Sequence, residues 1–298
     1  MRRLSALISA LLSFTAFSQG KAPAPAPVQT AVLVGVVAAV NDEVAKKQAD
    51  ALASFVATAL REQALPRVFA DQEALAVALG KGDIDVALMG PLGYCRLDAK
   101  AKPQLMVRMV RHGKSTYRSV LFAPPSSKLT SLDSLKKSKT PLKVAWVETS
   151  SATGYVIPKA TLLAAGINPA QAFETQDFLG SHDAVCNAVM EGKYDLGATF
   201  TDNLPNASKV TGCVGALGKK VDTLKVVAMS SEVPNDVLVS ASKFPHGKVE
   251  AIIAAAKAAG TTVEGKKTLQ AALLAEGVAD VKDEDFAPIR KALDAFVP

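Results

Sequence analysis

The chain has few of the residues on which metal sites and nucleic-acid surfaces depend. Its 298 residues include three cysteines, three histidines and one tryptophan, and aromatic residues make up only 5%. No two cysteines form a Cys-x-x-Cys pair, and the histidines stand apart, so a structural zinc site is not expected. The sequence gives no reason to expect a cofactor of any kind.

Familiar catalytic motifs are missing as well. There is no Gly-x-Ser-x-Gly elbow, no Gly-x-x-x-x-Gly-Lys-Ser/Thr loop and no His-Glu-x-x-His. His182 and Asp183 lie beside a serine, but adjacent residues of a helical turn point apart, so Asp183 is poorly placed to orient His182 in a triad. We therefore expect a binding protein and not an enzyme.

The positive charge is modest and dispersed. The formal net charge is +6, and the lysines are scattered, with only small clusters such as 136–137 and 219–220. A nucleic-acid surface would need a basic stripe, so no nucleic-acid partner is expected. A mildly basic surface can help to capture anions, although ordinary solvation explains it as well.

The one long apolar run lies at the N-terminus. Arg2 and Arg3 precede an apolar stretch at 4–17, which is shorter than the roughly 20 residues that a membrane span needs. Ala16 and Ser18 are the small residues expected before a cleavage point, so we predict a signal peptide at 1–18. An uncleaved anchor is the alternative. The Ala-Pro alternation that follows predicts an extended linker at 19–29.

The rest of the chain alternates between strand and helix patterns, which is typical of α/β folds with helix-covered sheets. A first alternation ends near residue 119 and a second near 229, and the tail after 245 is mostly helical. We expect two lobes, 30–119 plus 230–298 and 120–229, with a hinge where the chain crosses twice, near 117–123 and 224–230. The expected strands are 31–37, 67–69, 83–89, 105–111, 117–123, 143–147, 174–178, 194–200 and 225–229; the expected helices before the tail are 42–60, 72–79, 132–137, 152–165 and 182–190.

Polar segments follow three of these strands, and ligands of open α/β sheets bind at such strand ends. In one segment, Ser150, Ser151 and Thr153 offer hydroxyls at the start of a helix, where free N–H groups and the helix dipole favour an anion. Ordinary serine and threonine capping explains the same residues equally well. In the second, His182 lies in the first turn of a helix that Ser181 can cap. Its imidazole either donates a hydrogen bond to an anion or is a structural part of the helix cap.

The third segment contains Tyr94 in Gly90-Pro91-Leu92-Gly93-Tyr94. Its hydroxyl could cross a cleft, although a half-buried loop tyrosine is the plainer interpretation. Among the cysteines, Cys186 and Cys213 share the second predicted lobe and are the pair we favour for a disulfide after export, with Cys95 free. Three unpaired, buried cysteines are the alternative.

Taken in order, these segments resemble the phosphonate-, phosphite- and phosphate-binding proteins of ABC importers. The resemblance covers nearly the whole chain after the linker. The blocks that carry it are GDIDVA and GPLGY at 82–94, SATGYVIP at 151–158, GSHDAV at 180–185, GKYDLGAT at 192–199 and SSEVPND at 230–236.

The resemblance implies a type II periplasmic-binding-protein fold, two lobes that close on a ligand, and a periplasmic location. It implies that Ser151, the Ala152 N–H and Thr153 hold an oxyanion, that Tyr94 contacts it from the other lobe and that His182 adds a donor. It places Asp202 toward the organic or protonated end of the ligand. Ala152 departs from the family's usual threonine, and the loop at 38–41 lacks its usual proline.

The resulting hypothesis is a monomer that captures a small phosphorus oxyanion and delivers it to an ABC permease in the membrane. A sensory binding module that acts on a membrane signalling partner is the alternative function, and the sequence does not separate the two.

Overall fold

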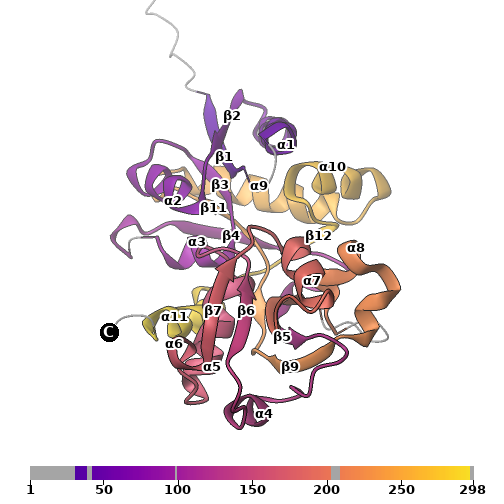
Figure 1. Cartoon of the computed structure of the whole chain (residues 1–298). Helices are drawn as coiled ribbons and strands as arrows, with labels where there is room; N and C mark the ends of the chain where they lie inside the picture. The colour runs from indigo at the N-terminus through magenta and orange to yellow at the C-terminus, as the bar shows by residue number, and fades with distance from the viewer. Residues whose placement is uncertain (1–30, 39–41, 98, 203–208, 296–298) are drawn as a thin grey trace, which may run out of the picture. The chain divides into compact units, whose positions relative to one another are not determined.

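The computed structural model describes residues 31–38, 42–97, 99–202 and 209–295 (Figure 1). The predicted signal peptide at 1–18 and linker at 19–29 lie outside these residues. Within them, two six-stranded mixed sheets carry helices on their faces, so the predicted two-sheet α/β fold class is confirmed.

The first sheet has the strand order β12-β4-β11-β3-β1-β2. Strands β1, β2 and β3 are parallel, and β11 lies antiparallel between β3 and β4. The strands are β1 (Val32–Val37), β2 (Ala64–Phe69), β3 (Val86–Met89), β4 (Gln104–Val110), β11 (Val237–Ser240) and β12 (Gly277–Ala279).

Apolar residues alternate between the two faces of this sheet. Val32, Val34 and Val36 of β1 belong to the core formed with helices α1 (Asp42–Leu60), α9 (His246–Ala259) and α10 (Val263–Leu273). Leu33 and Val37 face the core formed with α2 (Gln72–Lys81), α3 (Pro91–Cys95) and α11 (Ala287–Asp294). This alternation follows from the two-residue period of a strand.

The second sheet has the order β10-β5-β8-β6-β7, with β9 paired to β5. One face carries α4 (Leu132–Lys136), α5 (Ile157–Ala164) and α6 (Pro169–Ala172), and the other carries α7 (His182–Met190) and α8 (Val214–Leu217). The strands are β5 (Thr116–Ala123), β6 (Leu142–Trp146), β7 (Phe173–Phe178), β8 (Leu196–Thr201), β9 (Lys225–Met229) and β10 (Val233–Pro234).

Short helical turns complete the two units. They are the 3-10 helices η1 (Ala99–Ala101), η3 (Thr211–Cys213), η4 (Gly218–Thr223) and η5 (Asp283–Phe286), and a π-helical turn, η2 (Ala152–Val156), that leads into α5.

The structure differs from the predicted elements in several places, mostly in element bounds and in short elements. The helix expected at 152–165 begins as the π-helical turn η2. The helix expected to end at Gly80 continues to Lys81, and Gly82 ends it with a left-handed φ of 80°, which glycine adopts without strain. Strands β10, β11 and β12 were not predicted, because runs of two to four residues are too short to show a period.

The chain passes between the sheets at 111–115 and again at 230–236, and these two crossing segments are bonded to each other. The Asn235 N–H donates to the Ser115 carbonyl at 3.0 Å, and the Asn235 side chain donates to the Lys114 carbonyl at 3.0 Å. The division into lobes and the hinge strands at 117–123 and 224–230 stay a prediction, although β11, α9 and α10 do belong to the first sheet's layers.

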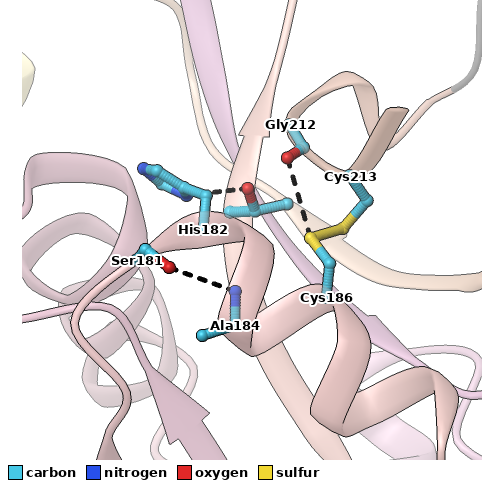
Figure 2. The surroundings of a disulfide bond; sticks show 7 residues. Ser181, His182, Ala184, Cys186, Gly212 and Cys213 are labelled. Carbon is cyan, nitrogen blue, oxygen red and sulfur yellow. Dashed lines mark hydrogen bonds between the residues drawn. A yellow bond between two sulfur atoms is a disulfide. The ribbon is translucent and has the colours of Figure 1, made fainter. Parts of the chain in front are cut away.

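The predicted disulfide between Cys186 and Cys213 is confirmed (Figure 2). Cys95 is a free thiol. The bond joins α7 to η3 beneath the second sheet, with a Cα–Cα distance of 5.4 Å. Both cysteines are fully buried in the apolar core of that face. The crosslink therefore ties the chain after β8 to the helix that begins at His182.

Reducing this disulfide is expected to lower the free energy of unfolding by about 3 kcal/mol, because the reduced unfolded chain gains the freedom of an open loop. The bridged residues are 27 apart in sequence. Urea unfolding with and without reductant measures the difference. A Cys95→Ala variant is the control and should show the same difference, and finding three reactive thiols in denaturant without reductant would contradict the bond.

Candidate functional site

A cavity of about 350 Å³ lies at the ends of strands from both sheets. The first sheet and its helices contribute Gln72 and 90–93, and the second sheet with its helices contributes Tyr117, Glu148, 150–153, His182, Phe200 and Asp202. The crossing segments contribute Arg111, His112, Asn235 and Asp236. Six of the seven predicted ligand-binding residues line it: Ser150, Ser151, Ala152, Thr153, His182 and Asp202.

The segment 150–154 forms a capped helix start that follows β6. The Ser151 hydroxyl caps it by accepting the Gly154 N–H at 3.0 Å. The Thr153 carbonyl accepts the Ser119 hydroxyl at 2.8 Å, and Thr153 is only 4% exposed. A Cβ on Gly154 would overlap the Val147 side chain, so glycine allows the turn to pack on the strand end. The first N–H groups of such a turn lack helical partners and can bind an anion.

The start of α7 meets the same cavity through His182. The Ser181 hydroxyl accepts the Ala184 N–H at 3.2 Å, and the His182 Nδ1 lies 2.8 Å from the Thr199 hydroxyl (Figure 2). The imidazole also packs against the Phe200 ring in a T-shaped arrangement, with 5.1 Å between the two ring centres. Burial lowers the pKa of His182 from 6.5 to about 4, against an opposing effect of Asp183. His182 is therefore neutral at physiological pH, with one ring nitrogen able to donate.

The crossing segments supply charged residues that the sequence did not point to. The Arg111 guanidinium donates to Asp236 at 2.6 Å and, through Nε, to the Leu274 carbonyl at 2.8 Å. Among the described residues that line the cavity, Arg111 is the only arginine or lysine. Because Arg111 and Asp236 are 125 residues apart, no local pattern indicated their meeting.

Asp202 is held at the end of β8 by contacts on two sides. Its N–H donates to the Thr211 hydroxyl at 2.8 Å, and its carboxylate lies 3.0 Å from the Nδ1 of His112. His112 lies between β4 and β5, in the crossing segment 111–115. Its contact with Asp202 therefore joins this crossing segment to the end of β8 in the second sheet. The Asp202 side chain is 14% exposed and that of His112 is 69% exposed.

Tyr94, which was predicted to contact the ligand, is not among the described residues that line the cavity. Tyr94 is only 7% exposed, and it donates its hydroxyl to Asp283 at 2.6 Å. The physical reason is that Gly90-Pro91 starts the short helix α3, which turns Tyr94 into the apolar core. The tyrosine that lines the cavity is Tyr117 of β5, and burial raises the pKa of its phenol, which therefore remains a hydrogen-bond donor.

Known proteins resemble this chain in sequence and in fold. The sequence model of the family described as "ABC transporter, phosphonate, periplasmic substrate-binding protein" matches residues 34–286. A binding protein component of an ABC phosphonate transporter from Pseudomonas aeruginosa is 20% identical, with a TM-score of 0.67 and coverage of 89% of this chain and 86% of that one.

Two further solved structures are similar over 89% of this chain and 99% of theirs. PhnD1 from Prochlorococcus marinus in complex with methylphosphonate is 17% identical with a TM-score of 0.69, and XAC2383 from Xanthomonas citri bound to ATP is 16% identical with a TM-score of 0.72. At these identities the structural likeness shows the fold alone.

The low pKa of His182 predicts a loss of stability in acid. The unfolded chain binds a proton on this residue near pH 6.5 and the folded chain only near pH 4, so the free energy of unfolding should fall as the pH drops through this window. Urea unfolding at pH 7, 5.5 and 4.5 measures it. In His182→Gln the free energy of unfolding should fall less between pH 7 and pH 4.5 than in the wild type. In His246→Gln, whose changed residue does not line the cavity, it should fall as much as in the wild type. Equal drops in all three proteins would contradict the low pKa.

Proposed function

This chain belongs to the family of periplasmic substrate-binding proteins of phosphonate ABC transporters, and from that premise we propose that its cavity captures a small phosphorus oxyanion for delivery to an ABC permease. The family is a binding component of transporters and not an enzyme family. The structural neighbours confirm the type II periplasmic-binding-protein fold. In the described part of the chain, no helix is both long and apolar enough to cross a membrane.

The observation that carries the proposal is the meeting of two helix starts at one cavity. The turn at 151–153 and the first residue of α7, His182, both line it, and they come from neighbouring strands of the same sheet. Each start presents free N–H groups and the positive end of a helix dipole. With Ser151, Thr153 and Tyr117 as hydroxyl donors, the anion is held mainly by neutral groups. Such fixed donors strengthen when closure of the two lobes excludes water.

The remaining charges favour a phosphonate with a cationic organic end over inorganic phosphate. The carboxylates of Glu148, Asp202 and Asp236 line the cavity with a single guanidinium, that of Arg111, which is bonded to Asp236. A bare dianion would lose part of its binding energy to repulsion from the other two carboxylates. An ammonium group on the ligand would turn this repulsion into attraction. Among simple phosphonates, 2-aminoethylphosphonate has this arrangement.

The protein is proposed to act as a periplasmic monomer, cleaved after Ser18, with 30–119 plus 230–298 and 120–229 as its lobes. A thermal-shift screen with phosphate, phosphite, methylphosphonate, 2-aminoethylphosphonate and sulfate tests the ligand class, because a ligand that binds only the folded state raises the melting temperature. No shift with any of the four phosphorus oxyanions would overturn the proposal.

Removing the Thr153 hydroxyl tests the anion site. Thr153→Val keeps the volume of the buried side chain but loses the donor, so affinity for the phosphonate should fall tenfold or more, as expected for a hydrogen bond to a charged group worth about 1.5–3 kcal/mol. Thr153→Ser keeps the hydroxyl and is the matched control, with affinity close to the wild type. Calorimetry that finds no difference between the two variants would place the anion elsewhere.

Neutralising Asp202 tests the cationic end of the ligand. Asp202→Asn should weaken 2-aminoethylphosphonate about tenfold or more by loss of a charge-assisted contact, while methylphosphonate should bind unchanged or more tightly. Calorimetry with both ligands on the wild type and on the variant gives the comparison. If the two ligands lost affinity equally, Asp202 would support the fold of the cavity and not the choice of ligand.

A further inference from the structure

The C-terminal segment Asp283–Asp294, here called the strap, contacts elements of both sheets. It consists of η5 and α11. Helix α11 packs against α3 beside the first sheet and against α5 and η2 beside the second. The strap therefore contacts the turn η2, and the start of that turn lines the cavity.

Tyr94 fixes the strap to the first sheet through a cluster of polar and aromatic contacts. Its hydroxyl donates to the Asp283 carboxylate at 2.6 Å, and Arg290 donates to the same carboxylate oxygen at 2.6 Å and to the Asp283 carbonyl at 3.0 Å. The Tyr94 ring lies 4.4 Å from that of Phe286, centre to centre, and Arg290 lies 5.9 Å from the Tyr94 ring. These contacts join α3, η5 and α11 into one unit.

An apolar cluster connects the strap and α3 with the turn η2. Phe286 and Ile289 of the strap are fully buried, and they share a core cluster with Val156 and Ile157, where η2 passes into α5. Ala152 and Tyr117, both of which line the cavity, pack on the same cluster. Because protein interiors are close-packed, a shift of the strap would be felt at the start of η2, one helical turn away.

We propose that Tyr94 is a positioning residue for the oxyanion site: by clamping the strap through Asp283 and Arg290, it holds the turn at 151–157 in the geometry that binds the anion. The inference rests on the proposed function for its ligand, but the placement of the turn can be measured without any ligand. It also gives Tyr94 a role, although residues 90–93 line the cavity and Tyr94 itself does not.

Tyr94 suits this role because it stays a hydrogen-bond donor. Burial, and then the bond to Asp283, raise the pKa of its phenol well above the ordinary value. Arg290 holds the Asp283 carboxylate in the charged form by lowering its pKa. The clamp therefore keeps its protonation states throughout the physiological pH range.

The test compares Tyr94→Phe with Tyr194→Phe. The first variant removes the hydroxyl from the clamp but keeps the ring that contacts Phe286. The second removes a hydroxyl that donates to the Asp177 carboxylate at 2.7 Å on an exposed part of the second sheet, and Tyr194 packs on the core of the face that carries α7 and α8. Hydrogen exchange of the ligand-free proteins is followed at 152–157, at the strap and in β1, and calorimetry measures 2-aminoethylphosphonate and methylphosphonate affinity.

Tyr94→Phe should speed exchange at the strap and at 152–157, leave β1 unchanged and weaken both ligands about three- to tenfold, as for the loss of one hydrogen bond. Tyr194→Phe should do none of this. Unchanged exchange at 152–157, or unchanged affinity despite faster exchange there, would overturn the positioning role. If the wild type bound neither ligand, the proposed function would fail, and the exchange data would still decide whether the clamp orders the turn.

Discussion

The bonding between the two crossing segments is the constraint on which the rest of the site depends. Residues 111–115 and 230–236 are joined by the Asn235 bonds to Ser115 and Lys114 and by the ion pair of Arg111 with Asp236. Both members of that ion pair line the cavity, so the contacts that join the sheets also form the cavity wall. Two charges bonded to each other leave little net field at that wall, which allows neutral donors of the second sheet to decide where an anion is held.

The two sheets are also joined by an apolar cluster that includes residues of the strap. Leu92 of α3, Phe286 of η5 and Ile157 of α5 all belong to it. Apolar contact is non-directional and tolerates small shifts, whereas the hydrogen bonds of the Tyr94 clamp fix the direction of the strap. The combination lets large buried surfaces join the sheets while a few polar contacts determine their alignment.

The chemistry of the cavity follows from where helices begin. Ser151 and Ser181 each cap a helical turn by accepting a backbone N–H three residues on, which leaves the earlier N–H groups free for a ligand. Burial keeps His182 neutral, so its presence adds a donor without adding a fixed charge. A site of this kind gains its strength from preorganised dipoles, and its selectivity from the carboxylates that stand around it.

The sequence by itself determined the features that are local along the chain. Strand-to-helix transitions with serine and threonine predicted the two helix starts, and they placed Ser151, Thr153 and His182 in what proved to be one cavity. The disulfide of Cys186 and Cys213 was predicted because both cysteines belong to the same unit. Tertiary structure alone decided the rest. Strand β11 enters the centre of the first sheet from residues 237–240, Arg111 contacts Asp236, and Tyr117 lines the cavity whereas Tyr94 does not. The physical reason is distance along the chain: capping and periodicity are properties of a few neighbouring residues, whereas these contacts join residues more than 100 positions apart or depend on which way a five-residue helix turns its side chains.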